Sequence, residues 1–390
     1  MTLLPASEAG VAEAVREAHD AREPLAIEGN ATLAAALRPV QAARTLSTRA
    51  LAGITLQSPS ELVISARAGT PMPVLEAALA QHGQHMVSEP PDLSAVMGTA
   101  GPPTLGGIVA ANLSGPRRVA LGATRDQVIG VRAVNGLGEA FHSGGRVLKN
   151  VTGLDLCKFL TGSFGTLAVL TEITLKVLPA PETTGSLLLL GLDDAAGVAK
   201  LCAGMGTPYG VSGAAHLPVE AASRLGFPQA ATLLRIEDFY ASVAYRLQRL
   251  EAELGGTILP DAESRAAWRA IRDLAPLGAE PDQAIWKLSL RPTDGPLVAA
   301  RLHGFRHYFD WSGGLLWLAG PATEAAHRQV EAAVRASRGT WQMLRAPDGL
   351  RLAIDAIPPE PAALAAIGAR VKAAMDPRGI LNPGRMRAGL

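Results

Sequence analysis

The chain has 390 residues with a formal net charge of +1, and 48% of its residues are hydrophobic while 18% are charged. This length suffices for a large core and predicts two or three domains. The balanced charge, without a block of Lys or Arg, argues against nucleic acid or an anionic membrane surface as a partner.

Cysteine content and apolar runs predict a cytoplasmic protein. The two cysteines, Cys157 and Cys202, lie far apart and outside any CxxC pair. They are too few for an iron–sulfur cluster or a four-ligand zinc site within this chain, and they suit a reducing compartment. The longest apolar run, 187–192, is far shorter than the roughly 20 residues that cross a bilayer. No basic start followed by an apolar run predicts a secretory signal.

Helix and strand patterns alternate in the first part of the chain. Valines at i, i+4 spacing predict a helix over 8–19, and a short strand is expected at 24–27. Alternating apolar residues predict a strand at 61–66, and proline at an early helical position marks a helix over 74–82.

A hairpin is expected next. Two strand-like runs, 126–134 and 139–142, flank Asn135-Gly136, which is a strong turn signal. Another strand is predicted over 168–178. The proline-rich stretch 179–184 then marks a domain boundary.

Apolar strands and Ala-rich helices alternate over residues 185–365. This pattern predicts an α+β unit of antiparallel strands with helices on one face. The expected strands are 231–236, 284–290 and 314–318, and the expected helices are 241–254, 323–337 and 361–375.

Four segments rich in Gly or Asn stand out: 104–118, with the diglycine Gly106-Gly107, then 144–155, 160–167 and 376–386. A backbone without side chains can approach a diphosphate and donate peptide N–H groups, and helix N-termini favour anions. For the diglycine alone, plain close packing of a helix is the commoner explanation. Together the four segments lie at intervals that one large cofactor could bridge.

On these segments the chain resembles flavoproteins of the vanillyl-alcohol oxidase superfamily, which carry the PCMH-type FAD-binding domain. The resemblance is greatest to the smaller of the FAD-binding subunits in bacterial three-subunit glycolate oxidases. It is strong over 24–181 and over the last residues, 376–390, and weak between them. It implies an α+β fold: a PCMH-type FAD-binding domain of two α/β subdomains at 1–180, a smaller cap with antiparallel strands at 181–365, and a segment at 366–390 that returns to the flavin.

The resemblance also implies which residues bind FAD. Loop 27–33 stands where relatives wrap the diphosphate, and because it lacks the histidine that some relatives use for attachment, noncovalent FAD is expected. Glu28 adds a negative charge there. The residues expected at the flavin are Gly29, Asn30, Ala31, Thr32, Pro90, Pro91, Thr104, Gly106, Gly107, Ala110, Asn112, Gly115, Arg117, Arg118, Arg125, Asp126, Lys149, Asn150, Thr152, Gly153, Asp155, Gly162, Ser163, Gly165, Thr166, Ile173, Asn382 and Arg385.

Structural alternatives stay open at several of these positions. Residues 88–92, taken in isolation, are typical of an ordinary Pro-Pro loop. Arg125 and Asp126 could instead form a structural ion pair, and Asp155 could instead cap the following helix. Arg117 and Arg118 offer a guanidinium fork that would offset diphosphate charge. Ile173 would present backbone groups to the adenine from an otherwise ordinary buried strand.

No catalytic residue and no metal site is predicted. The cap lacks the two-histidine motif around Gly-Asp-Gly-Asn that relatives use to hold a metal or a substrate carboxylate. His303 and His307 have the i, i+4 spacing of a helical metal pair, but without a third ligand a surface role is favoured. His82 and His85, on either side of Gly83, are expected at the end of a helix and not as a pair of metal ligands. Four further side chains could bind a carboxylate, with nothing to select among them: Tyr308, Arg291, Arg345 and Arg235.

The resemblance therefore implies an FAD-dependent oxidoreductase subunit that supports the oxidation of glycolate to glyoxylate and onward electron transfer. Its partners would be a larger FAD-binding subunit and an iron–sulfur subunit, at the inner face of the cytoplasmic membrane or free in the cytoplasm. Two alternatives remain: a self-sufficient FAD-dependent hydroxy-acid or alcohol oxidoreductase, and a non-catalytic assembly subunit.

Overall fold

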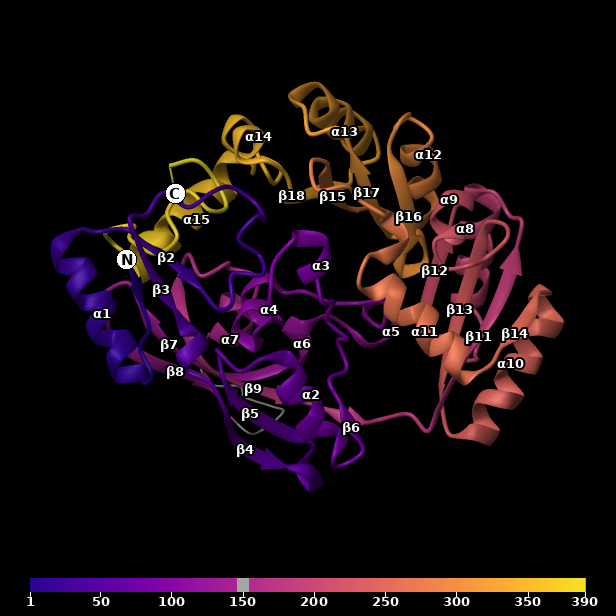
Figure 1. The fold of residues 1–390 in the computed structure, drawn as a ribbon, viewed down its shortest axis with the longest axis horizontal. Coiled ribbons are helices and arrows are strands. Elements are labelled where there is room, and N and C mark those ends of the chain that lie inside the picture. The colour runs from indigo at the N-terminus through magenta and orange to yellow at the C-terminus, as the bar shows by residue number, and fades with distance from the viewer. Residues whose placement is uncertain (146–153, 390) are drawn as a thin grey trace. The chain divides into compact units, whose positions relative to one another are not determined.

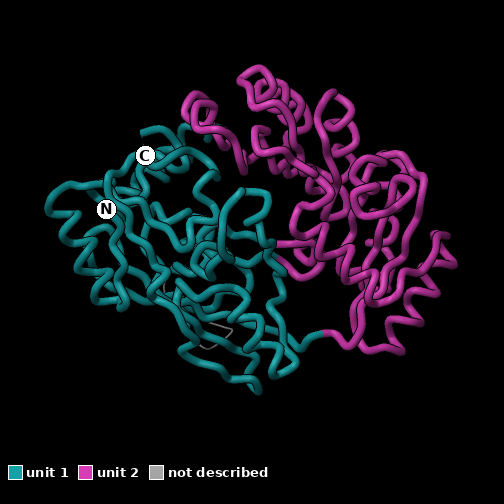
Figure 2. The backbone as a smooth tube through the Cα atoms, viewed as in Figure 1, with its two compact units in different colours: residues 1–113, 123–180, 359–390 teal, residues 114–122, 181–358 magenta. Residues whose placement is uncertain are grey.

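The computed structural model describes residues 1–145 and 154–389, and these divide into two compact units (Figure 2). Unit 1 comprises residues 1–113, 123–180 and 359–390, and unit 2 comprises 114–122 and 181–358. The backbone thus leaves unit 1 for unit 2 at residue 114, comes back at 123, and crosses again at 181 and 359.

Unit 1 contains a small parallel sheet and a larger antiparallel one (Figure 1). The parallel sheet has the order β1-β3-β2, with β1 (Thr2–Leu3), β2 (Leu25–Glu28) and β3 (Arg44–Ser47). Helix α1 (Glu8–Ala21) buries Val11 and Val15 against a core that includes Leu25 and Leu46, which confirms the predicted helix. Its N-cap, Ser7, accepts a hydrogen bond from the Gly10 amide at 3.1 Å.

The antiparallel sheet of unit 1 has five strands in the order β4-β5-β9-β7-β8. The predicted hairpin is confirmed, since β7 and β8 pair antiparallel across Asn135-Gly136. The bounds are β4 (Ile54–Ser58), β5 (Val63–Arg67), β7 (Val128–Asn135), β8 (Ala140–Gly144) and β9 (Ala168–Lys176), with a separate pair β6 (Gln84–His85) and β10 (Leu178–Pro179).

The C-terminal segment adds an edge to the parallel sheet. The Leu25 amide donates to Ile380 O at 2.8 Å, and the Asn382 amide donates to Leu25 O at 3.0 Å. This segment follows helix α15 (Ala362–Met375). Residues 380–382 therefore act as a short strand beside β2, more than 350 positions away in the sequence.

Unit 2 is built on one antiparallel sheet of eight strands in the order β14-β11-β13-β12-β16-β17-β15-β18. The strands expected at 231–236, 284–290 and 314–318 are all present. Their bounds are β11 (Thr183–Leu190), β12 (Gly213–Leu217), β13 (Ala231–Asp238), β14 (Thr257–Leu259), β15 (Ala284–Ser289), β16 (Arg306–Asp310), β17 (Leu315–Gly320) and β18 (Thr340–Arg345).

Long helices pack on this sheet. Helices α8 and α10 lie against strands β11, β12 and β13, and Leu201, Leu234 and Leu247 belong to the core between them. The long helices are α8 (Asp194–Met205), α10 (Tyr240–Leu254), α11 (Asp261–Arg272) and α13 (Glu324–Ala336).

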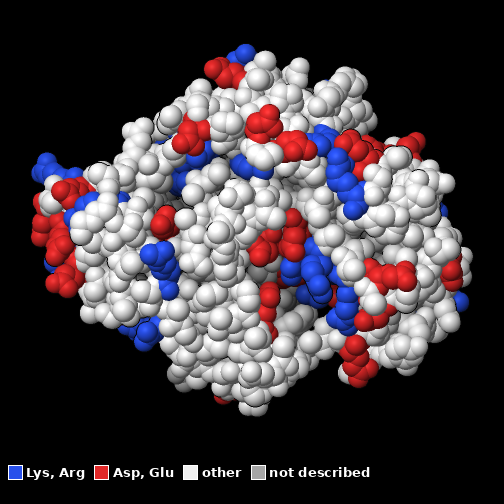
Figure 3. All heavy atoms as spheres, viewed as in Figure 1, with Lys and Arg blue, Asp and Glu red and all other residues white. Residues whose placement is uncertain are grey.

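Shorter helices connect these elements in both units. They are α2 (Met72–Ala80), α3 (Ser94–Met97), α4 (Leu105–Ala111), α5 (Arg118–Leu121), α6 (Thr124–Gln127), α7 (Leu156–Leu160), α9 (Val219–Ser223), α12 (Gly295–Ala299) and α14 (Asp348–Ala353). Within the described ranges no helix has the length and apolar character needed to cross a membrane. On the face shown in Figure 3, cationic and acidic side chains are interspersed among a mostly uncharged surface.

Candidate functional site

The loop after β2 is held close to the segment before helix α4. The Asn30 side-chain amide donates to Pro102 O at 2.9 Å, and the Ser47 hydroxyl donates to Gly29 O at 2.8 Å. A Cβ added at Gly29 would overlap the Thr104 hydroxyl. The two segments can therefore approach this closely only because residue 29 is glycine.

The same loop presents unused peptide donors. Ala31 has a φ of 56°, in the left-handed region, and within the described chain no group accepts a hydrogen bond from the amides of Asn30, Ala31 and Thr32. Consecutive amides in a loop with a left-handed residue form a concave donor group that suits an anion. Burial raises the pKa of Glu28, which stands at the start of this loop.

The diglycine packs closely against the segment 68–70. The Leu105 amide donates to Thr70 O at 2.9 Å, and the Gly106 amide donates to Ala68 O at 2.7 Å. The Gly107 amide donates to the Thr104 hydroxyl, which caps helix α4. These first amides already have acceptors within the protein, so the diphosphate contacts expected of Gly106 and Gly107 stay predictions. A Cβ on Gly106 would lie 2.9 Å from that of Ala68.

The loop 162–166 runs beside the end of helix α4. The Gly162 amide donates to Val109 O at 3.1 Å, and the Phe164 amide donates to Ala110 O at 2.8 Å. Ser163 is buried, and among the described residues its hydroxyl has no hydrogen-bond partner, whereas Thr166 donates its hydroxyl to Ser163 O at 2.7 Å. The structure thus brings two of the predicted Gly-rich segments together and leaves one donor available.

Residues after helix α4 form a second polar turn. Asn112 adopts a φ of 50°, and its side-chain oxygen accepts from the Arg125 amide at 3.0 Å. The Asp126 carboxylate accepts from the Ala123 amide at 2.9 Å, which makes it a helix cap. These contacts place Asn112, Arg125 and Asp126 side by side in unit 1.

Asn382 and Arg385, in the C-terminal segment, form hydrogen bonds with the loops after β2 and before β9. The Asn382 side chain accepts from the Ile27 amide at 2.7 Å and donates to Phe164 O at 2.8 Å, while Gly165 packs against it. The Arg385 guanidinium donates to the carbonyl oxygens of residues 33, 34 and 38. Both side chains fix the loops around the donors, which is a positioning role that the sequence alone did not distinguish from flavin contact.

The segment 88–92 contains an unsatisfied hydroxyl. Ser88 is fully buried, and no described group forms a hydrogen bond with its Oγ. The Asp92 carboxylate accepts from the Ser94 hydroxyl at 2.6 Å, and that hydroxyl also lies 2.9 Å from Gly101 O. Buried polar groups without a partner are rare in proteins and indicate an absent ligand or water. Pro90 and Pro91 lie within this loop, between the orphaned hydroxyl and the Asp92 turn.

Three predicted flavin residues, Gly115, Arg117 and Arg118, belong to unit 2. The Arg117 guanidinium forms a bidentate pair with Glu237, at 2.9 and 2.8 Å, and Gly115 O accepts from the Trp311 ring nitrogen at 3.0 Å. Both donors of the Arg117 guanidinium fork therefore bind the Glu237 carboxylate of the protein itself.

The remaining residues predicted to contact the flavin lie in separate parts of unit 1. Ile173 is fully buried in the centre of β9, in register with Ala66 and Val131 of the neighbouring strands. Asp155 caps helix α7 by accepting from the Lys158 amide at 3.2 Å, as the structural alternative expects. Four predicted residues, Lys149, Asn150, Thr152 and Gly153, lie outside the described residues.

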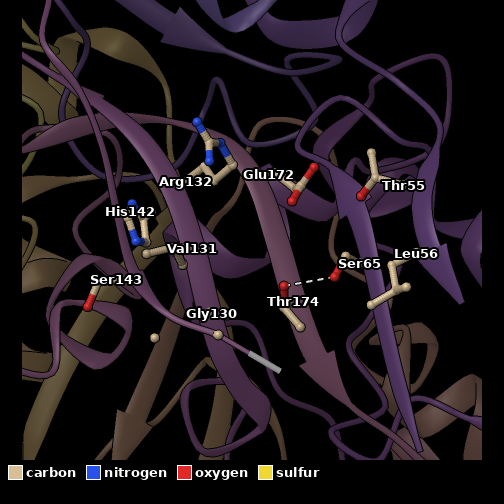
Figure 4. A pocket seen from close by; sticks show the side chains of 12 residues that line it. Thr55, Leu56, Ser65, Gly130, Val131, Arg132, His142, Ser143, Glu172 and Thr174 are labelled. Carbon is tan, nitrogen blue, oxygen red and sulfur yellow. Dashed lines mark hydrogen bonds between the residues drawn. The ribbon is translucent and has the colours of Figure 1, made fainter. Parts of the chain in front are cut away.

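A separate pocket of about 340 Å³ opens on the polar face of the five-stranded sheet (Figure 4). In it Ser65 and Thr174 share a hydrogen bond of 2.8 Å, and Arg132 and Glu172 stand in the next row. The Arg132 guanidinium is already paired with Glu8, whose pKa that hydrogen bond lowers. Alternation of polar residues along β9 is the signal in the sequence that could have located this face.

Histidines of unit 2 do not form the helical pair considered above, because His307 lies on strand β16 and His303 lies before that strand. Instead Asp194 bridges two histidines, with 2.9 Å to His307 Nε2 and 3.2 Å to His216 Nε2. Burial alone would raise the pKa of Asp194, but the two imidazoles outweigh it and hold that pKa well below its usual range. No set of three or more acidic, His or Cys side chains in the described chain is arranged to hold a metal ion.

The four carboxylate-binding candidates of unit 2 are all engaged by the protein. Tyr308 donates to Ile271 O at 2.8 Å, and Arg345 donates to Gln283 O at 3.0 Å. Arg291 pairs with Asp294, and Arg235 pairs with Glu237.

Sequence comparison relates the chain to FAD-binding proteins. A family model described as an FAD binding domain matches residues 1–144. The chain is 34% identical over 380 residues to the glycolate oxidase subunit GlcE of Escherichia coli, which covers 97% of each chain. It is 42% identical over 87 residues to the glycolate oxidase subunit GlcD of Bacillus subtilis, covering 22% of this chain and 18% of that one.

Solved structures share the fold at low identity. The 4-ethylphenol oxidase of Gulosibacter chungangensis superposes with a TM-score of 0.73 at 12% identity, covering 100% of this chain and 89% of that chain. An alkyldihydroxyacetonephosphate synthase superposes with a TM-score of 0.71 at 16% identity, covering 98% of this chain and 76% of that chain. At such identities the likeness concerns the fold alone.

Proposed function

The chain belongs to the family of FAD-linked oxidoreductase subunits that includes the glycolate oxidase subunit GlcE, and from this premise we propose that it is the FAD-binding subunit of a glycolate oxidase complex. FAD is its cofactor. The observation that carries the proposal is the set of unused donors in unit 1: the amides of Asn30, Ala31 and Thr32, and the hydroxyls of Ser88 and Ser163. A diphosphate and a polar ring edge need donors of these kinds.

The residues of the chain hold and orient the cofactor in this proposal. The three amides of the loop after β2 donate to diphosphate oxygens, and Ser163 donates from the loop beside helix α4. Asn382 and Arg385 keep these loops in place. Bound FAD supplies the hydride acceptor that oxidation of a 2-hydroxy acid such as glycolate requires. Loop 27–33 has no histidine, so the cofactor is held without a covalent bond.

The complex contains more than one kind of subunit, since GlcE and GlcD both carry the name of glycolate oxidase. A larger FAD-binding subunit and an iron–sulfur subunit are the proposed partners. With two cysteines this chain cannot supply the four thiolates of an iron–sulfur cluster, so electrons that pass beyond flavin need another subunit. Contact with the inner face of the cytoplasmic membrane would then come through those partners.

The absorption spectrum of the purified full chain tests the proposal. We expect flavin bands corresponding to about one FAD per chain, and acid precipitation should release the chromophore into the supernatant because it is not covalently attached. A colourless chain that stays colourless after incubation with FAD would overturn the proposal. Flavin that stays with the acid precipitate would overturn the noncovalent assignment alone.

Gly29→Ala should lower FAD affinity at least tenfold, which corresponds to about 1.4 kcal/mol. The added Cβ overlaps the Thr104 hydroxyl and pushes the loop after β2, with the free amides of residues 30–32, away from the segment before helix α4. Equilibrium dialysis or flavin fluorescence titration measures the change. Gly349→Ala is the matched control, since its Cβ enters open space in unit 2 and should leave affinity unchanged. Equal affinity of both variants would show that the approach of the two segments is unimportant.

A further inference from the structure

Unit 2 holds a segment that interrupts unit 1. This strap, residues 114–122, belongs to unit 2 by its contacts, while the chain on both sides of it belongs to unit 1 (Figure 2). It contains helix α5, which lies against strand β12 and the turn at residues 311–313. The strap thus joins the two units through the covalent chain.

The two ends of the strap are held together in unit 1. The Asn112 side-chain oxygen accepts a hydrogen bond from the Arg125 amide at 3.0 Å, and the Thr124 hydroxyl donates to Leu113 O. Helix α4, which ends directly before Asn112, accepts hydrogen bonds from two amides of the loop 162–166. The base of the strap is therefore bonded to one of the segments that the proposed function places at the flavin.

Two anchors hold the strap in unit 2. The Arg117 guanidinium pairs with Glu237 through two donors, at 2.9 and 2.8 Å, and these side chains are only 12% and 7% exposed. The Trp311 ring nitrogen donates to Gly115 O at 3.0 Å, and the Arg118 guanidinium lies 4.6 Å from the centroid of the same indole. A bidentate ion pair, an indole hydrogen bond and a cation–π contact together fix both the backbone and the side chains of the strap.

The turn that carries Trp311 is itself well determined. Trp311 and Ser312 have φ values of 49° and 60°, so two successive non-glycine residues lie in the left-handed region. The Trp311 amide donates to the Asp310 carboxylate at 2.7 Å. Strained backbone persists only where the surroundings determine it, and such places cluster at functional sites. The indole is therefore a fixed point to which the strap is attached.

We propose that Trp311 is a positioning residue for FAD: by holding the strap at Gly115, it fixes the turn formed by Asn112 and Arg125 at the flavin. That this turn contacts the flavin rests on the proposed function, whereas the anchors and the bonded base are features of the structure. A segment fixed at its far end has fewer conformations at its base, so less ordering remains when the cofactor binds. Because a coupling free energy is reciprocal, bound FAD in turn stabilises unit 2.

Trp311→Phe tests the proposal, because it removes the ring N–H that bonds to Gly115 O and keeps an aromatic ring. We expect this variant to bind FAD at least about threefold more weakly than the parent chain, in a flavin fluorescence titration of the full chain without cofactor. Trp341→Phe is the matched control and should leave FAD affinity unchanged. Trp341 also lies in unit 2 and is 3% exposed, but its ring nitrogen has no hydrogen-bond partner among the described residues.

Unfolding of unit 2 supplies a measurement that a merely structural role of Trp311 would not change. Tryptophan emission follows this unfolding, because all five tryptophans of the chain lie in unit 2, at positions 268, 286, 311, 317 and 341. In Trp341→Phe, saturating FAD should raise the thermal midpoint by at least about 2 °C. In Trp311→Phe the FAD-dependent rise should be smaller by about half or more. A purely structural loss would lower the midpoint equally with and without FAD.

The outcomes keep this proposal apart from the proposed function. Equal FAD affinity in Trp311→Phe and Trp341→Phe would overturn the positioning role, and so would an FAD-dependent rise of the same size in both. Either result with a yellow parent chain leaves the proposed function standing. A parent chain that takes up no FAD overturns the proposed function, and the positioning role falls with it. Circular dichroism checks that each variant is folded. Should Trp311→Phe not fold, Glu237→Gln, which weakens the other anchor, takes its place with the same expected results.

Discussion

Replacing Glu237 by alanine should destabilise unit 2 by about 3–5 kcal/mol, the range for removing one partner of a buried ion pair. The Glu237 side chain is 7% exposed and joins Arg117 to Arg235, which is itself 1% exposed. The Ser212 hydroxyl also donates to it, at 2.7 Å. Without the carboxylate, two guanidinium groups remain buried beside each other. Urea or thermal unfolding measured by circular dichroism gives the loss.

A surface pair provides the control for this prediction. Glu220→Ala removes an exposed partner of Arg224 on one face of a short helix and should change stability by no more than about 0.5 kcal/mol. If Glu237→Ala also stays within about 1 kcal/mol of the parent chain, the cluster does not stabilise unit 2 as argued.

Lowering the pH should reduce the difference in stability between the parent chain and the Glu237 variants. Burial alone would raise the pKa of Glu237, but Arg235 and Arg117 outweigh it and hold that pKa well below its usual range. A carboxylate with a lowered folded-state pKa contributes stability above its unfolded-state pKa, and this contribution is lost as pH falls toward the folded-state value. The gap between the parent chain and Glu237→Gln should therefore be widest at neutral pH and narrow below about pH 4.

Asp376→Ala should cost unit 1 about 3–5 kcal/mol and release its flavin. Asp376 is 1% exposed, and it accepts from the Ile380 and Leu381 amides at 3.1 and 2.8 Å. Lys372 donates to it at 2.6 Å and reaches Thr166 O at 2.7 Å. Without the Asp376 carboxylate, residues 380–382 should detach from β2. The loop after β2, which contains the free amides of residues 30–32, would then no longer be held in place. Denaturation followed by tryptophan and flavin fluorescence measures both effects.

Asp20→Ala controls for the loss of a carboxylate in unit 1, since that side chain is exposed at the end of helix α1. Its stability should stay within about 0.5 kcal/mol of the parent chain. Flavin retention by Asp376→Ala at the level of Asp20→Ala would contradict the bracing role of the C-terminal segment.

Local patterns predicted the elements of this fold well. The hairpin at Asn135-Gly136, the helices α1, α10, α13 and α15, and the strands β13, β15 and β17 follow from turn residues and apolar spacing, which are properties of neighbours in sequence. The α+β class and the FAD-binding family are confirmed by comparison with known proteins.

The roles of individual site residues were harder to predict, because they depend on partners far along the chain. The diglycine looked like a diphosphate site, yet its amides donate to Ala68 and Thr104. Arg117 looked like a diphosphate ligand, yet Glu237, 120 residues away, takes its guanidinium. Sequence shows that a donor exists but not which acceptor the fold brings to it. The flavin contacts of the predicted residues stay predictions.

The discontinuity of unit 1 constrains how the protein can be made. Residues 380–382, which complete the edge of β2, are synthesised more than 350 residues after β2, so a nascent chain cannot finish unit 1 until unit 2 has been made. Such distant pairing slows folding and prolongs the exposure of an unpaired strand edge. A gene shortened after codon 180 would therefore yield an aggregation-prone fragment rather than a minimal flavoprotein, whereas cuts within surface loops of unit 2 would leave that edge closed.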